Sequence, residues 1–151
     1  MKARTLLFLL LLCVFNPSFA ETPPASASLD SERVVRVYEL LKDAEAMATS
    51  GVLGSHDDLT KEARSMSLTG LKKACLDSVD HITAAASSSP TNRRPDIFGY
   101  VKNAWLRLSY NREEDHGGHT AYAVNNRAKA SAETRGIART IKEALTKSDL
   151  K

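Results

Sequence analysis

Histidines, carboxylates and glycines gather in one short stretch, residues 112–120 (R-E-E-D-H-G-G-H-T). His116 and His119 flank the Gly117–Gly118 pair, and Asp115 directly precedes them. Imidazole nitrogens and carboxylate oxygens are suitable ligands for zinc or copper, and two glycines would let the backbone wrap closely around an ion. This combination of residue types makes His116, His119 and Asp115 candidate metal ligands.

The same stretch is also typical of a tight turn between two helices that binds nothing. Gly117 can end a helix in a left-handed conformation, and His116 is favoured near a helix C-terminus because it interacts well with the helix dipole. His119 or Thr120 can then begin the next helix. The residues are compatible with both interpretations.

A second run that combines histidine with carboxylates, His56-Asp57-Asp58, follows the first expected helix. In a four-helix bundle with up-down-up-down topology, the first and third connections lie at the same end. That arrangement would bring His56 close to His116 and His119. The sequence therefore predicts, as one hypothesis, a metal site for zinc or copper at one end of a helical bundle.

Other groups with possible catalytic chemistry are less well placed. Cys75 and His81 lie six residues apart, so roughly 600° of helical rotation leaves them about 120° apart on the helix surface. Cys75 falls within an apolar stripe, where cysteine behaves as a small buried hydrophobic residue, and Asp77 is the expected ion-pair partner of His81. No G-x-S-x-G, Walker or H-E-x-x-H motif is present. Without a nucleophile–base pair, the sequence favours a non-catalytic protein with no cofactor.

The N-terminus has the three parts of a secretory signal. Lys2 and Arg4 precede an apolar run over residues 6–15, and Ser18-Phe19-Ala20 offers a cleavage site before Glu21. The run is shorter than the roughly 20 residues that span a bilayer. We expect a signal peptide over residues 1–20, a secreted or periplasmic protein, and no stable membrane insertion after cleavage.

The charge balance argues against nucleic acid as a partner. The chain has 21 Lys and Arg against 18 Asp and Glu, so removing Lys2 and Arg4 leaves a net charge of only +1. Non-specific nucleic-acid binding requires a surplus of cations facing phosphates. Arg135, Arg139 and Lys142 share a face of the last expected helix, but glutamates nearby make a solvated surface the simpler explanation.

Apolar residues recur at helical spacing in four segments after a flexible, Pro- and Ser-rich leader over residues 21–29. The first helix is expected from Asp30, as cap, to Ser50–Gly51, and the second from His56, with its apolar stripe shifting at Thr69–Gly70. We interpret that shift as a kink, with two separate helices as the alternative. The third helix starts at residues 95–96, and the fourth covers residues 120–147. The expected fold is all-α: one domain over residues 30–148, a four-helix up-down-up-down bundle, or five helices if the second breaks at Gly70.

Aromatic residues cluster in the third expected helix. Phe98 and Trp105, seven residues apart, flank its apolar line, and Tyr100 and Tyr110 are close in sequence. Aromatic side chains anchor protein interfaces when they are not part of the core. The leading hypothesis is therefore an exported helical protein that binds an unidentified protein partner through a bundle surface. The alternative is a periplasmic bundle that binds or senses metal through its loop histidines.

Overall fold

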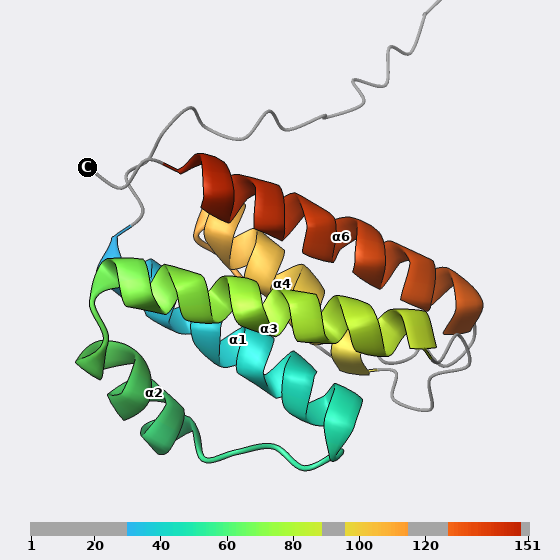
Figure 1. The fold of residues 1–151 in the computed structure, drawn as a ribbon, viewed down its shortest axis with the longest axis horizontal. Coiled ribbons are helices and arrows are strands. Elements are labelled where there is room, and N and C mark those ends of the chain that lie inside the picture. Colours follow the sequence, from blue (N-terminus) through green and yellow to red (C-terminus); the bar gives the residue numbers. More distant parts are fainter. Residues whose placement is uncertain (1–29, 89–95, 115–126, 149–151) are drawn as a thin grey trace, which may run out of the picture.

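The structure, a computed structural model, describes residues 30–88, 96–114 and 127–148, and these form a bundle of α-helices (Figure 1). The described residues contain no β-strand, so the all-α bundle expected from the sequence is confirmed. The helices, in chain order, are α1 (Ser31–Thr49), α2 (His56–Ser65), α3 (Leu68–Ser88), α4 (Asp96–Tyr110) and α6 (Arg127–Lys147).

Helix α1 begins and ends where its sequence signals lie. The Asp30 carboxylate accepts a hydrogen bond of 2.6 Å from the Arg33 backbone amide, as expected of an N-cap. The last turn closes through Ser50, whose amide donates to Ala46 O, and Gly51 follows with φ 74°. That left-handed conformation is easy for glycine, so Gly51 ends the helix without strain.

The shift of the apolar stripe marks a true break between α2 and α3, so the kink interpretation was wrong and the two-helix alternative is correct. The break lies at Met66, which is extended, and Ser67, rather than at Gly70, which is inside α3. Ser67 Oγ accepts a hydrogen bond of 3.1 Å from the Gly70 amide and so caps the new helix. A Cβ at position 70 would lie 3.2 Å from that same oxygen, which explains why glycine suits the position.

Helix α4 ends earlier than the Gly117 stop expected from the sequence. Its last residue is Tyr110, and Asn111 adopts a left-handed conformation with φ 52°. The Asn111 amide still donates to Arg107 O at 3.0 Å, as in a normal helix end. Asparagine tolerates this conformation better than other non-glycine residues, so Asn111 takes the role that Gly117 was expected to have.

Contacts between helices fix their directions. Helix α2 runs back along α1, because Thr60 lies on Glu39 while Arg64, one turn later, reaches Glu32. Helix α4 also runs opposite to α1, since Glu113, just past its end, contacts Arg36. Figure 1 shows α1 and α3 pointing the same way, so α1 to α4 alternate in direction. Because the predicted second helix is two helices, α4 runs opposite to α1, whereas the four-helix prediction placed them parallel.

The predicted alternation does not continue to α6. Lys72, in the first turn of α3, donates to the Ser148 carbonyl after α6, and Arg135 donates to the Ala86 carbonyl near the end of α3. Helix α6 is therefore antiparallel to α3 and points the same way as α4 (Figure 1). The prediction that the last helix reverses direction was wrong. It assumed that consecutive long helices are joined by short turns, and that assumption fails between α4 and α6.

The core lies between the four long helices and follows the predicted apolar stripes. Helix α1 is the most deeply buried, packing on α2, α3 and α4. None of the described helices is long and apolar enough to cross a membrane. The most buried large apolar side chains are Val34, Val37, Tyr38, Leu40, Leu41, Leu71, Val79, Ile82, Val101, Ile141 and Leu145.

Candidate functional site

Three of the four predicted metal ligands, Asp115, His116 and His119, lie outside the described residues. The fourth, His56, begins α2, and its Nε2 lies 3.0 Å from Asp43 Oδ2. Residues 111–114 lie near the beginning of α1, because Glu113 contacts Arg36. The connection before His56 follows the end of α1, so the two segments lie at opposite ends of that helix. The topological reason for placing these connections together was therefore wrong. Within residues 30–88, 96–114 and 127–148, no group of three His, Cys, Asp or Glu side chains could hold a metal ion. The site itself stays a prediction.

The aromatic residues proposed as partner anchors belong largely to the bundle interior. Phe98 is buried, and Tyr100 and Trp105 are half-buried and pack against the core. Tyr110 is also half-buried, and the Arg112 guanidinium lies 5.2 Å from the centre of its ring. Their role as anchors stays a prediction, with Phe98 the least accessible of the four.

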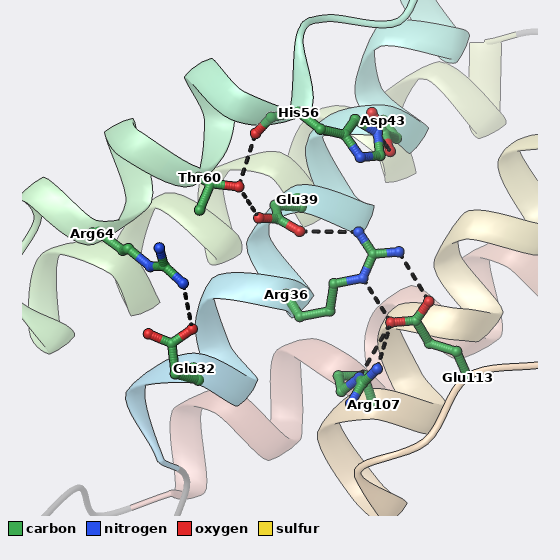
Figure 2. A network of polar contacts seen from close by, with 9 residues as sticks. All are labelled: Glu32, Arg36, Glu39, Asp43, His56, Thr60, Arg64, Arg107 and Glu113. Atoms are coloured by element: carbon green, nitrogen blue, oxygen red, sulfur yellow. Dashed lines mark hydrogen bonds and ion pairs between the residues drawn. The ribbon is translucent and has the colours of Figure 1, made fainter.

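A stripe of charged residues, missed in the sequence, runs along one face of α1. Glu32, Arg36, Glu39 and Asp43 recur at steps of three and four residues, so they share a face of the helix. Figure 2 shows this stripe covered by α2 on one side and by Glu113 on the other. The sequence did carry a signal. Helix α1 has apolar residues on several faces, which indicates a central helix whose charged side chains must also find buried partners.

Arg36 is the centre of this stripe. Its guanidinium donates from Nε and Nη2 to the two carboxylate oxygens of Glu113, and from Nη1 to Glu39 at 2.9 Å. Arg107 donates to the same Glu113 at 2.8 Å. Hydrogen bonding from Arg36 lowers the pKa of Glu113 to about 2, with Arg107 adding to the effect against the opposing influence of burial. Glu113 is therefore ionised at neutral pH, and it connects α1 to α4 through Arg36 and Arg107.

Helix α2 is held on α1 mainly by polar contacts. Thr60 Oγ1 donates to Glu39, and Arg64 donates to Glu32 at 2.9 Å in an exposed pair. Ala63 is the only residue of α2 that is fully buried. Among the described helices, α2 has close packing chiefly with α1. A short helix with so little apolar burial is the least stably attached element of the bundle.

Asp43 is the most unusual group beneath α2. Its side chain is only 1% exposed, yet neither carboxylate oxygen accepts a hydrogen bond of normal geometry. The nearest charged group is His56, at ion-pair distance and itself 53% exposed. Burial raises the pKa of the Asp43 carboxyl above its ordinary value, and His56 and Arg36 offset this only in part. Buried carboxylates are normally well hydrogen-bonded, so the environment of Asp43 is unusual among the described acidic residues.

A second polar cluster joins α1 to α3 around Glu45. Lys42 and Ser78 each donate to Glu45 at 2.9 Å, and His81 Nδ1 lies 2.6 Å from its other oxygen. Although burial opposes ionisation, these contacts together lower the pKa of Glu45. His81 thus pairs with Glu45 and not with Asp77, which the sequence suggested and which instead binds Lys73.

Neither the Glu45 cluster nor Cys75 forms a nucleophilic centre. In the Glu45 cluster the carboxylate stands between Ser78 and His81, whereas a serine nucleophile needs the histidine beside it as base. Cys75 is fully buried, and burial raises the pKa of its thiol to about 12. A thiol of that pKa is almost entirely protonated at neutral pH and therefore unreactive.

The connection between α1 and α2 carries the exposed apolar surface of the described bundle. Val52 and Leu53 are 71% and 42% exposed, and they are the large apolar side chains that stand out on the described surface. All residues from 51 to 58 are exposed, including the carboxylates of Asp57 and Asp58. We call residues 51–58 the α1–α2 connection surface.

Comparisons with protein-family models, with curated proteins and with solved structures found no match to this chain.

Proposed function

We propose that this protein is a non-catalytic binding protein, secreted or periplasmic, that recognises a protein partner through the α1–α2 connection surface. The observation that carries the proposal is the pair of neighbouring apolar side chains, Val52 and Leu53. Both are exposed, whereas the other large apolar side chains of the described residues are buried or half-buried. Exposed apolar residues rimmed by polar ones are typical of binding surfaces. Here the rim is formed by Asp57 and Asp58.

Two further observations support this choice of surface. The α4 aromatics expected to anchor a partner are half-buried or buried, so they offer less apolar area to a partner than their size suggests. The α1–α2 connection, in contrast, is joined to the weakly packed helix α2. A surface next to a loosely attached element can adjust to a partner without disturbing the core.

The non-catalytic part of the proposal is supported by the order of groups around Glu45 and by the inert thiol of Cys75. The extracytoplasmic part is supported by the N-terminal sequence, with Lys2 and Arg4 before the apolar run and Ser18-Phe19-Ala20 after it. N-terminal sequencing of protein from its native host tests the export step. A mature chain that begins at Glu21 is expected, and an intact Met1 or Lys2 would contradict it.

Affinity capture from the native extracytoplasmic fraction, with mass spectrometry, tests the surface. The wild type is compared with the double variant Val52→Ser, Leu53→Ser and with a control, Ala84→Ser, Ala132→Ser, at exposed positions of α3 and α6. We expect a partner that binds the wild type and the control but is lost with the double variant. The partner is then purified and its Kd measured by calorimetry. Equal Kd values for all three proteins would refute the proposed surface.

Trp105→Ala, checked for folding by circular dichroism, separates this proposal from the aromatic surface expected from the sequence. If the partner binds through Val52 and Leu53, the folded Trp105→Ala variant keeps its affinity. Loss of binding in that variant, with the Val52 and Leu53 variant unaffected, would move the binding surface to α4.

A further inference from the structure

Among the described residues, no side chain donates a hydrogen bond of normal geometry to the buried Asp43 carboxylate. The other charged groups around it are Arg36 and Glu39 of α1 and His56 of α2. The hydrogen bonds that Arg36 makes go to Glu113 and Glu39. Glu39 is itself an acceptor. Among the described residues, the side chain at ion-pair distance from Asp43 is His56, with Nε2 3.0 Å from Asp43 Oδ2. His56 is half-exposed and lies at the beginning of a weakly packed helix.

We propose that Asp43 is a recessed acceptor for one basic side chain, Lys or Arg, of the bound partner, and that His56 occupies the place of this cation in the free protein. The proposal rests on the function proposed above, because His56 belongs to the α1–α2 connection surface. Figure 2 shows the imidazole of His56 beside the Asp43 carboxylate. Because the Asp43 side chain is only 1% exposed, the proposal requires the His56 side chain to move away when a ligand binds.

Charge and chemistry favour a basic side chain over other ligands. A carboxylate without hydrogen bonds gains most from an ionised donor, since charge-assisted hydrogen bonds are about twice as strong as neutral ones. Asp57 and Asp58, next to His56, add negative potential that attracts a cation to this place. A metal ion would need further ligands, and the described residues around Asp43 supply none beyond His56.

The connection surface and Asp43 are close enough in the chain to serve one partner segment. His56 is three residues from Leu53. Apolar contacts with Val52 and Leu53 would supply affinity, while the buried carboxylate would select a segment with a correctly placed cation. Apolar anchoring combined with one buried charge pair is a common way to obtain both affinity and specificity.

The test uses small analogues of basic side chains with the full-length protein. n-Butylammonium and n-butylguanidinium are titrated at pH 7 while the NMR signals of the His56 ring and the Asp43 carboxyl carbon are followed, with 1-pentanol as the uncharged control. We expect saturable shifts of both groups with the two cations and none with the alcohol. The absence of a saturable shift with both cations, or an equal response to the alcohol, would overturn the proposal.

Two variants sharpen the result. Asp43→Asn removes the acceptor's charge and one buried carboxylate, so it is expected to fold well and to bind the cations at least tenfold more weakly. His56→Gln removes the competing imidazole, so it is expected to bind them several-fold more tightly. A purely structural His56–Asp43 pair would leave the affinity unchanged in His56→Gln. Unchanged binding in Asp43→Asn would likewise refute the site.

The outcome can be separated from that of the proposed function. If Asp43→Asn binds the purified partner as tightly as the wild type while the Val52→Ser, Leu53→Ser variant does not, the connection surface is correct and the cation site is wrong. If neither variant weakens partner binding, the proposed surface itself is wrong. An equal loss with both variants supports the two proposals together.

Discussion

Arg36 and Glu113 form a two-point ion pair, with Arg36 Nε 2.6 Å from Glu113 Oε1 and Arg36 Nη2 2.9 Å from Glu113 Oε2. The pair joins α1 to the chain just beyond α4, across 77 positions of sequence. Asn103 fixes the next residue, because its side-chain oxygen accepts a hydrogen bond of 2.8 Å from the Glu114 amide. The end of α4 is thus attached to the bundle by buried polar contacts as well as by apolar packing.

Arg36→Gln should lower the free energy of unfolding by about 2 kcal/mol, because it removes hydrogen bonds between ionised, partly buried groups. Arg64→Gln is the matched control, since Arg64 makes one ion pair with Glu32 on the open surface. Such pairs contribute little to stability. Urea denaturation of both variants checks this expectation. Equal losses of stability would show that Arg36 contributes no more than a surface ion pair.

The contribution of Glu113 should depend on pH. Its pKa is about 2 in the folded protein and about 4.3 in an unfolded chain, so folding favours the ionised form. The stabilisation by ionised Glu113 is fully present at pH values above the pKa of the unfolded chain. It is lost as the pH falls through the pKa of the folded protein. Glu113→Gln should therefore be less stable than the wild type at pH 6, with the difference shrinking between pH 4 and 2. Urea midpoints at several pH values measure this. A difference that does not shrink on acidification would contradict the pKa assignment.

Asp43→Asn should stabilise the protein at pH 7 by about 1 kcal/mol, because a neutral amide is less costly to bury than a carboxylate that accepts no hydrogen bond of normal geometry. The folded-state pKa of Asp43 is raised, so stability linked to its protonation is present below about pH 4 and is lost as the pH rises through the folded pKa. The gain from Asn should therefore vanish in acid. Urea denaturation of Asp43→Asn at pH 7 and in acid measures this, and Asp77→Asn, at an exposed carboxylate, is the control at both pH values.

The thiol of Cys75 should resist modification in the folded protein. It is fully buried, and its raised pKa leaves almost no thiolate at pH 8. Iodoacetamide treatment followed by peptide mapping should show Cys75 unmodified in buffer and modified in 6 M urea. Rapid alkylation in buffer would indicate that α1 and α3 separate readily, or that the thiol is accessible.

The sequence predicted the helices well because caps and apolar spacing are local signals. Asp30 and Gly51 bound α1 as expected, and the line of Ile97, Val101 and Leu108 on α4 is buried as expected. The shift of the apolar stripe indicates a change between α2 and α3, but Gly70 suggests a break three residues later than Ser67, whose capping hydroxyl marks the true start of α3. Similarly, the glycine pair Gly117–Gly118 is a stronger signal for a helix end than Asn111, where α4 does end.

The candidate site was much less predictable than the helices. The ion pair between Arg36 and Glu113 depends on which helices pack against each other, and so does the lack of normal hydrogen bonds to Asp43. The order of helices in the sequence does not determine their packing. The predicted proximity of His56 to the later histidines depended on strict alternation of helix direction. Because α2 and α3 are separate helices, α4 runs opposite to α1 and ends near the beginning of α1, so that argument lost its basis. The exposure of Val52 and Leu53 was not predicted, because two consecutive apolar residues in a loop have no periodicity that indicates which side chains are exposed.

The directions of the helices also decide how the molecule displays its surface. The beginning of α1 and the end of α6 lie at one end of the bundle, as the contact between Lys72 and Ser148 and Figure 1 show. Val52 and Leu53 follow α1 at the opposite end. An attachment made near residue 30 or residue 148 would therefore hold the bundle upright, with these two side chains facing outward. For immobilised binding measurements, a tether at either of these positions leaves the connection surface unobstructed.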